Sequence, residues 1–149
     1  MEPAMSSSPV SNADASPQIV GNIGMFYACY RLSLLGWNVM PTTRNARGID
    51  IVAYSADAAQ FLGLQVKSLA RKSPVPLGTT LDKIMGHIWI IVNNAISDRP
   101  STFIMFPGEV KERAHRGEKE GRISYWLQPR DYDRDEFREA WHRLQPVGA

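Results

Sequence analysis

Apolar residues recur at regular spacing only after a polar start, and this contrast divides the chain into two parts. Residues 1–18 are rich in Ser, Pro, Ala and Asn with little to bury, so we expect a disordered tail. Residues 19–149 have the length of a single domain. The first periodic segment predicts a mostly buried helix over about 20–35, which Gly36 ends. The apolar stripe of this helix comprises Ile23, Phe26, Tyr27, Tyr30 and Leu34, and Leu32 and Leu35 widen it.

The rest of the chain alternates between short apolar runs and polar turns, a pattern that predicts strands. We expect these strands at residues 37–40, 49–54, 61–67, 87–92, 102–106 and 123–127. Pro74, Pro76 and Gly78 predict an irregular segment after the third strand. A short helix from Pro107 and a closing helix over 135–144 complete the elements. The sequence therefore predicts an α/β fold, a mixed sheet of about five strands with the first helix on one face and the later helices on the other.

The composition is that of an ordinary soluble domain, with 44% apolar and 21% charged residues. The single cysteine, Cys29, excludes a disulfide framework and is expected to be a small buried hydrophobe. No apolar run approaches the roughly 18 residues of a membrane span, and the N-terminus lacks the features of a signal peptide. We therefore expect a cytoplasmic protein. A net charge of +2 is too small to identify a nucleic-acid partner by itself.

One predicted hairpin carries polar side chains among its apolar ones. The residues Arg47-Gly48-Ile49-Asp50-Ile51-Val52 are followed, after a polar turn, by Leu64-Gln65-Val66-Lys67. Residues two apart in a strand share a face, so Gln65 and Lys67 project together. With the turn centred near Ala58, Asp50 is expected opposite about Lys67, on that same face. Desolvating such a polar trio is costly unless its members pair with one another or bind something.

The polar trio has two interpretations. Asp50 and Lys67 could form a cross-strand ion pair on a solvated sheet face, a contact worth roughly 0.2–1 kcal/mol. Alternatively the trio is a site for metal-assisted phosphodiester hydrolysis, because Mg²⁺ prefers oxygen ligands and keeps several waters. Asp50, the side-chain oxygen of Gln65 and the backbone carbonyl of Val66 would then be the ligands. Lys67 would stabilise developing negative charge or act as the base.

The motif resembles the PD-(D/E)XK nuclease superfamily, in particular its Mrr-like and Holliday-junction-resolvase-like branches. The similar segments are Gly21-x-x-Gly24, the helix end Leu34-Leu35-Gly36-Trp37-Asn38-Val39, Gly48-x-Asp50, and Gln65-Val66-Lys67. The resemblance covers residues 21–67 and implies a restriction-endonuclease-like domain over 19–149. It also implies an Mg²⁺- or Mn²⁺-dependent DNA endonuclease of the restriction or repair type. Asp50, Gln65 and Lys67 would be its catalytic residues.

One position departs from the family pattern. Where the look-alike families usually carry a glutamate that completes the metal site, this chain has Met25. A single carboxylate, balanced by Lys67, predicts weak metal binding. Two functions stay open, a DNA endonuclease and a catalytically degenerate module that binds nucleic acid or a protein partner; a homodimer is compatible with both. The basic residues expected to contact DNA phosphates are Arg44, Arg47, Arg71 and Lys72.

Overall fold

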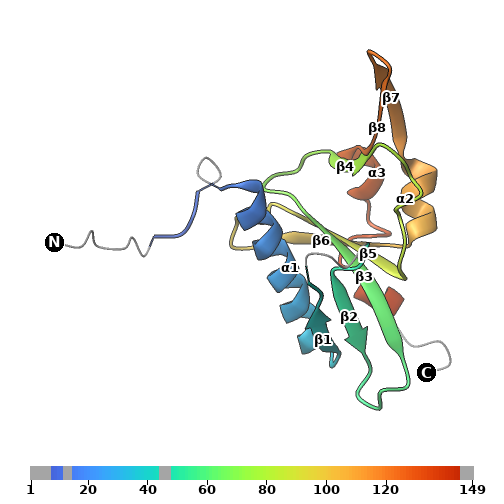
Figure 1. Ribbon diagram of the computed structural model, residues 1–149. Helices are drawn as coiled ribbons and strands as arrows, with labels where there is room; N and C mark the ends of the chain where they lie inside the picture. The colour runs from blue at the N-terminus through green and yellow to red at the C-terminus, as the bar shows by residue number, and fades with distance from the viewer. Residues whose placement is uncertain (1–7, 12–14, 44–47, 145–149) are drawn as a thin grey trace.

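The computed structural model describes residues 8–11, 15–43 and 48–144, and its course is drawn in Figure 1. The helices are α1 (Pro17–Leu34), α2 (Pro107–Arg113), α3 (Pro129–Tyr132) and a 3-10 helix, η1 (Trp141–Leu144). The strands are β1 (Asn38–Pro41), β2 (Ile51–Tyr54), β3 (Phe61–Ser68), β4 (Val75–Gly78), β5 (Ile88–Asn93), β6 (Ser101–Met105), β7 (His115–Lys119) and β8 (Arg122–Leu127). No helix in the described ranges is both long and apolar enough to cross a membrane.

Five of the strands form one mixed sheet in the order β1-β2-β3-β5-β6. β3 and β5 pair in parallel, with Leu64 beside Ile88, and the other neighbours are antiparallel. The predicted α/β fold with a mixed sheet of about five strands is therefore confirmed. A second sheet, which the sequence pattern did not predict, has the order β4-β8-β7.

Helix α1 begins at Pro17, three residues before the predicted start. Ser16 caps it, since its hydroxyl accepts a hydrogen bond from the Ile19 N–H, and proline at the first helical position has no N–H left to satisfy. Gly36, with φ of +89°, follows the helix in the left-handed conformation that favours glycine. Cys29 is buried as predicted, and burial raises the pKa of its thiol.

The buried face of α1 differs from the predicted stripe. Phe26, Tyr30 and Leu34 are exposed, with relative accessibilities of 58%, 59% and 66%. Leu32 is buried as predicted, and Ile23 and Tyr27 are partly buried, but the other buried positions of α1 are the smaller residues Val20, Gly24, Ala28 and Cys29. Small side chains allow the helix backbone to approach β3 closely, and this close approach overrides the burial of the larger residues.

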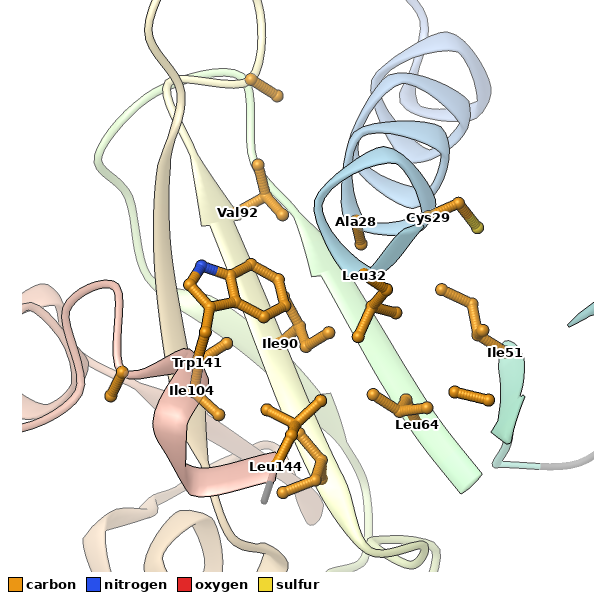
Figure 2. Packing of buried hydrophobic residues seen from close by; sticks show 14 of the residues in the cluster. Ala28, Cys29, Leu32, Ile51, Leu64, Ile90, Val92, Ile104, Trp141 and Leu144 are labelled. Atoms are coloured by element: carbon orange, nitrogen blue, oxygen red, sulfur yellow. The ribbon is translucent and has the colours of Figure 1, made fainter. Parts of the chain in front are cut away.

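Figure 2 shows the apolar cluster between α1 and the five-stranded sheet. Ala28 and Leu32 of α1 lie against the sheet that carries Ile51 and Leu64, and all four side chains are fully buried. Trp141 of η1 packs into the same cluster from a distant part of the chain. Burying a large apolar side chain contributes about 1.5–3 kcal/mol, so this cluster fixes α1 on the sheet.

The opposite face of the sheet carries a second apolar cluster. It joins Trp89 and Ile91 of β5 to residues of β4, β8, α2 and α3. In this cluster Phe103 of β6 meets Tyr132 of α3 edge-on, with ring centroids 5.3 Å apart. β5 is consequently buried on both faces, which explains why its sequence is apolar from Ile88 to Val92.

Three elements correct the sequence prediction. β4 forms where an irregular segment was expected, because an edge strand tolerates Pro76. β7 was not predicted from its polar sequence. The closing helix over 135–144 does not form, and only η1 is helical there. Its residues 137–139 hydrogen-bond to β6 instead, with the Phe137 carbonyl accepting from Ile104 N–H and the Glu139 N–H donating to Thr102.

Two glycines of α1 provide a test of the helix–sheet contact. A Cβ at Gly24 would overlap the Ser68 hydroxyl, whereas a Cβ at Gly21 would meet nothing within 4 Å. We expect Gly24→Ala to lower the free energy of unfolding by about 1–3 kcal/mol, and Gly21→Ala to raise it by roughly 0.5–1 kcal/mol. Urea unfolding of both variants measures the two shifts. Equal shifts of the same sign would contradict the close approach of α1 to β3.

Candidate functional site

The β2–β3 hairpin places Asp50 beside Gln65. Tyr54 pairs with Phe61 and Ile51 with Leu64; Asp50 lies just before this register, and its carboxylate accepts a hydrogen bond from Gln65 Nε2. The predicted pairing of Asp50 with Lys67 is therefore wrong by two residues. The reason is that the turn is centred between Asp57 and Ala58, one residue earlier than a pairing of Asp50 with Lys67 requires. Gln65 and Lys67 share one face of β3, as predicted, whereas Asp50 lines a pocket with Val66 on the side of α1.

Asp50 occupies the point where β2 and β3 separate. Its N–H donates to the Leu64 carbonyl, and its own carbonyl accepts from the Thr42 N–H, both at 2.8 Å. The carboxylate oxygen Oδ2 accepts two further hydrogen bonds, from Gln65 Nε2 at 2.9 Å and from the Val66 N–H at 2.8 Å. Backbone and side chain together hold this carboxylate in one position.

The backbone N–H and C=O groups of Val66 point toward the side of β3 on which Asp50 lies. In an antiparallel pair the N–H and C=O of one residue point to the same neighbouring strand. Since the Val66 N–H donates to the Asp50 carboxylate, the Val66 carbonyl also lies on the β2 side, past the point where β2 ends its pairing with β3. A carboxylate and a backbone carbonyl are thus adjacent at the edge of β3.

A pocket of about 270 Å³ lies between α1 and this edge. Its walls are formed by Gly21, Asn22, Met25, Thr42, Thr43, Asp50 and Val66. Met25 therefore shares a pocket with Asp50, at the position where the family resemblance places a glutamate. Asn22, Thr42 and Thr43 are polar lining residues that the sequence analysis did not select. Asn22 lies three residues before Met25, and this helical spacing is the signal that could have identified it.

Lys67 lies in a different environment, on the face that also carries Trp89. Its ammonium Nζ is 5.5 Å from the centre of the Trp89 indole ring. Burial lowers the pKa of Lys67 below its ordinary value of 10.5, and the negative charge of Asp50 offsets part of that change. Asp50 and Val66 thus line the pocket, Gln65 joins it through its hydrogen bond to Asp50, and Lys67 interacts with Asp50 electrostatically.

The predicted basic residues are only partly described. Arg44 and Arg47 lie outside the described residues. Arg71 is exposed after β3 and borders a second pocket, of about 350 Å³, beside the start of α1. Lys72 forms an ion pair with Asp133, with 2.7 Å between Nζ and Oδ2. Of the two described cations, Arg71 is therefore the one more available to an external phosphate.

The ligand set around Asp50 suits a hard cation but holds little charge. In the part of the chain that the structure describes, no three His, Cys, Asp or Glu side chains lie close enough together to hold a metal ion. The oxygens near Asp50 come from one carboxylate, the Val66 carbonyl and the Gln65 amide. Such oxygen donors fit Mg²⁺, which takes one or two carboxylates and completes its shell with water and substrate phosphates.

The packing of α1 on one face of a five-stranded mixed sheet defines a mixed α/β fold. Among solved structures, the chain is similar to a bacterial homing endonuclease, I-Ssp6803I, with a TM-score of 0.58 and 20% sequence identity. The similarity covers 86% of this chain and 92% of the endonuclease. No protein-family model and no curated protein matches the sequence. At this identity the comparison establishes a shared fold.

The lowered pKa of Lys67 makes a prediction about stability and pH. In the window between that lowered pKa and 10.5, the unfolded chain binds more protons than the folded one, so stability should rise with pH. Lys67→Met should lack this rise, whereas Lys111→Met, in an exposed position of α2, should retain it. Urea unfolding from neutral pH to just below the range of tyrosine ionisation measures the difference. Parallel pH profiles for the wild type and Lys67→Met would contradict the prediction.

Proposed function

We propose that this protein is a DNA endonuclease of the PD-(D/E)XK type, which hydrolyses phosphodiester bonds with Mg²⁺ or Mn²⁺. The observation that supports this most strongly is the meeting of three groups at one pocket: the Asp50 carboxylate, the Gln65 amide and the Val66 peptide. The shared fold with a homing endonuclease gives independent support.

Asp50 is the charged ligand of the proposed centre. Its Oδ2 is fixed by the Val66 N–H and the Gln65 amide, so Oδ1 is the oxygen assigned to the cation. The Val66 carbonyl is assigned as the second ligand. Gln65 uses its nitrogen to hold Asp50, which leaves its amide oxygen for the cation or for a water. When bound, the metal would supply Lewis acidity and a more acidic water.

Lys67 supplies the positive charge of the proposed reaction. As the ammonium, it stabilises negative charge that develops on the scissile phosphate. As the neutral amine, it accepts a proton from the attacking water, and its lowered pKa increases the fraction of amine present near neutral pH. Burial beside Trp89 strengthens either role, because charges interact more strongly away from bulk water.

A non-catalytic module that binds nucleic acid or a protein partner is the second candidate, and Met25 is the observation that favours it. Met25 is partly buried against the first apolar cluster and lines the pocket beside Asp50. It supplies no charge there, so the protein alone offers one carboxylate. Catalysis then requires the DNA phosphates to complete the coordination of the metal. The endonuclease and the non-catalytic module therefore differ in whether DNA bound at this pocket is cleaved.

Cleavage of supercoiled plasmid and branched DNA across Mg²⁺ and Mn²⁺ titrations tests the proposed activity. We expect the wild type to cut at high metal concentration, because one carboxylate binds a divalent cation weakly; Mn²⁺ accepts the same oxygen ligands. Asp50→Asn conserves the shape of the side chain and should slow cleavage by at least about 100-fold. Met25→Glu should lower the metal concentration required, and should cost roughly 1–3 kcal/mol of stability if the new carboxylate is unpaired.

Asp50→Asn also separates folding from chemistry, because its amide oxygen can still accept from the Val66 N–H. Its thermal unfolding should therefore stay close to that of the wild type. DNA binding without cleavage by the wild type, together with a Met25→Glu variant that neither binds metal nor cuts, would establish the non-catalytic module instead.

Arg71 and Lys72 form a matched pair for testing the DNA interface. Each phosphate contact changes the slope of log affinity against log salt by about one. Because Lys72 is engaged by Asp133, we expect Arg71→Ala to flatten the slope and Lys72→Ala to change it less. Fluorescence anisotropy with a labelled duplex over a salt series measures both. A larger change of the salt slope for Lys72→Ala than for Arg71→Ala would contradict the assignment of Arg71 as the phosphate contact.

A further inference from the structure

The β7–β8 hairpin stands out from the body of the molecule, at the end away from the β2–β3 turn (Figure 1). β4 pairs only with the three residues Tyr125–Leu127 at the base of β8. Beyond Tyr125, toward the turn, β7 and β8 pair only with each other among the described strands, as a two-stranded ribbon. Neighbouring strands lie about 4.8 Å apart, so this ribbon is narrow enough for the major groove of B-DNA, which is about 12 Å wide.

The tip of this ribbon is a tight, well-defined turn. Its central residues, Glu120 and Gly121, have φ of +52° and +76°, the pattern of a type I′ turn whose twist matches that of the flanking strands. The turn sets Lys119 directly opposite Arg122 in the register of the hairpin. Both side chains are exposed and lie on one face of the ribbon.

Two cations facing each other across a hairpin are destabilising by themselves. In the described ranges of the chain, neither Lys119 nor Arg122 forms an ion pair, whereas Arg116 on the opposite face pairs with Glu118 at 3.4 Å. The repulsion at the tip is relieved if an anion binds between the two side chains. Phosphate groups and the acceptor atoms of guanine fit such a pair of donors.

The base of the ribbon is held rigidly against the body. His115 bonds Asp131 through Nε2, at 2.8 Å, and stacks on the Trp126 ring with centroids 6.0 Å apart. The Trp126 ring also covers Gly117, where a Cβ would approach it to 2.9 Å. Trp126 thus stiffens the base of the ribbon. A rigid base holds the tip in a fixed direction relative to the sheet.

The base of the ribbon is also connected to the basic segment that follows β3. Tyr132 of α3 donates its hydroxyl hydrogen to the Ser73 carbonyl at 2.7 Å. Lys72, one residue earlier, pairs with Asp133. The segment after β3 is therefore tied to α3, which also holds the base of the ribbon through Asp131.

We propose that the β7–β8 ribbon enters the major groove of duplex DNA and holds it through Lys119 and Arg122. This inference rests on the proposed function and adds a DNA-holding element that lies apart from the candidate catalytic pocket. Duplex RNA is excluded as the ligand of the ribbon, because the major groove of A-form RNA is too narrow for side chains to read.

Binding of a fluorescein-labelled random-sequence duplex, measured by anisotropy over a salt series with Ca²⁺ in place of the catalytic metal, tests the proposal. Lys119→Ala/Arg122→Ala should weaken binding by about 100-fold, roughly tenfold for each lost contact, and flatten the salt slope by about one to two. Methyl green, which occupies the major groove, should compete with the protein. Netropsin, which occupies the minor groove, and duplex RNA should not.

Two control variants isolate the tip. Arg116→Ala/Glu118→Ala clears the other face of the ribbon without changing its net charge, and Lys111→Ala removes one charge from α2; both should bind DNA like the wild type. Wild-type affinity and salt slope in the tip variant would overturn the proposal, as would competition by netropsin alone. A loss of binding confined to the tip variant supports the ribbon even if no variant cleaves DNA. If the tip variant cleaves DNA and binds it with unchanged affinity, the DNA-holding role of the ribbon is wrong and the proposed endonuclease activity stands.

Discussion

At Gly24 the side chain of Ser68 alone separates α1 from β3, and its hydroxyl donates to the Val20 carbonyl at 2.6 Å. This close approach decides which residues of α1 reach the sheet. It leaves Phe26, Tyr30 and Leu34 outside the interface, and it brings Met25 to the edge of β3, beside Asp50. A wider separation would leave Asp50 on an open sheet edge, without the helical wall that makes a pocket there.

The candidate site combines firm positioning with a small net charge. Asp50 is held by hydrogen bonds from β3 and by its own backbone, and its charge is balanced by that of Lys67. Because the net charge of such a site is small, it gains little electrostatic energy when it binds a cation without DNA. A nucleic-acid backbone would add the missing negative charge, so under the proposed function DNA and metal bind cooperatively. This coupling would limit hydrolysis to moments when a substrate is in place.

The sequence predicted the elements whose local pattern of apolar and polar residues matches the burial of those residues in the fold. The β2–β3 hairpin, the doubly buried β5 and the α1 termini follow from strand alternation, apolar runs and capping residues. The exposed Phe26 and Tyr30 could not be anticipated, because hydrophobic spacing does not reveal a close backbone approach. The Asp50–Gln65 register depended on where a six-residue turn is centred, which composition does not determine. Residues 137–139 were misassigned as helical because their long-range hydrogen bonds to β6 leave no periodic signal.

Those hydrogen bonds to β6 have a consequence for how the protein behaves in concentrated solution. β6 is the last strand of the five-stranded sheet, and an uncovered edge strand offers its peptide groups to other chains. Residues 137–139 occupy that edge, with Phe103 bridging Arg138. The opposite edge is formed by the short β1, which ends at Pro41, a residue with no N–H to offer. A chain shortened before residue 137 would lose one of these two safeguards, and would be prone to self-association through β6 even if its remaining core folded.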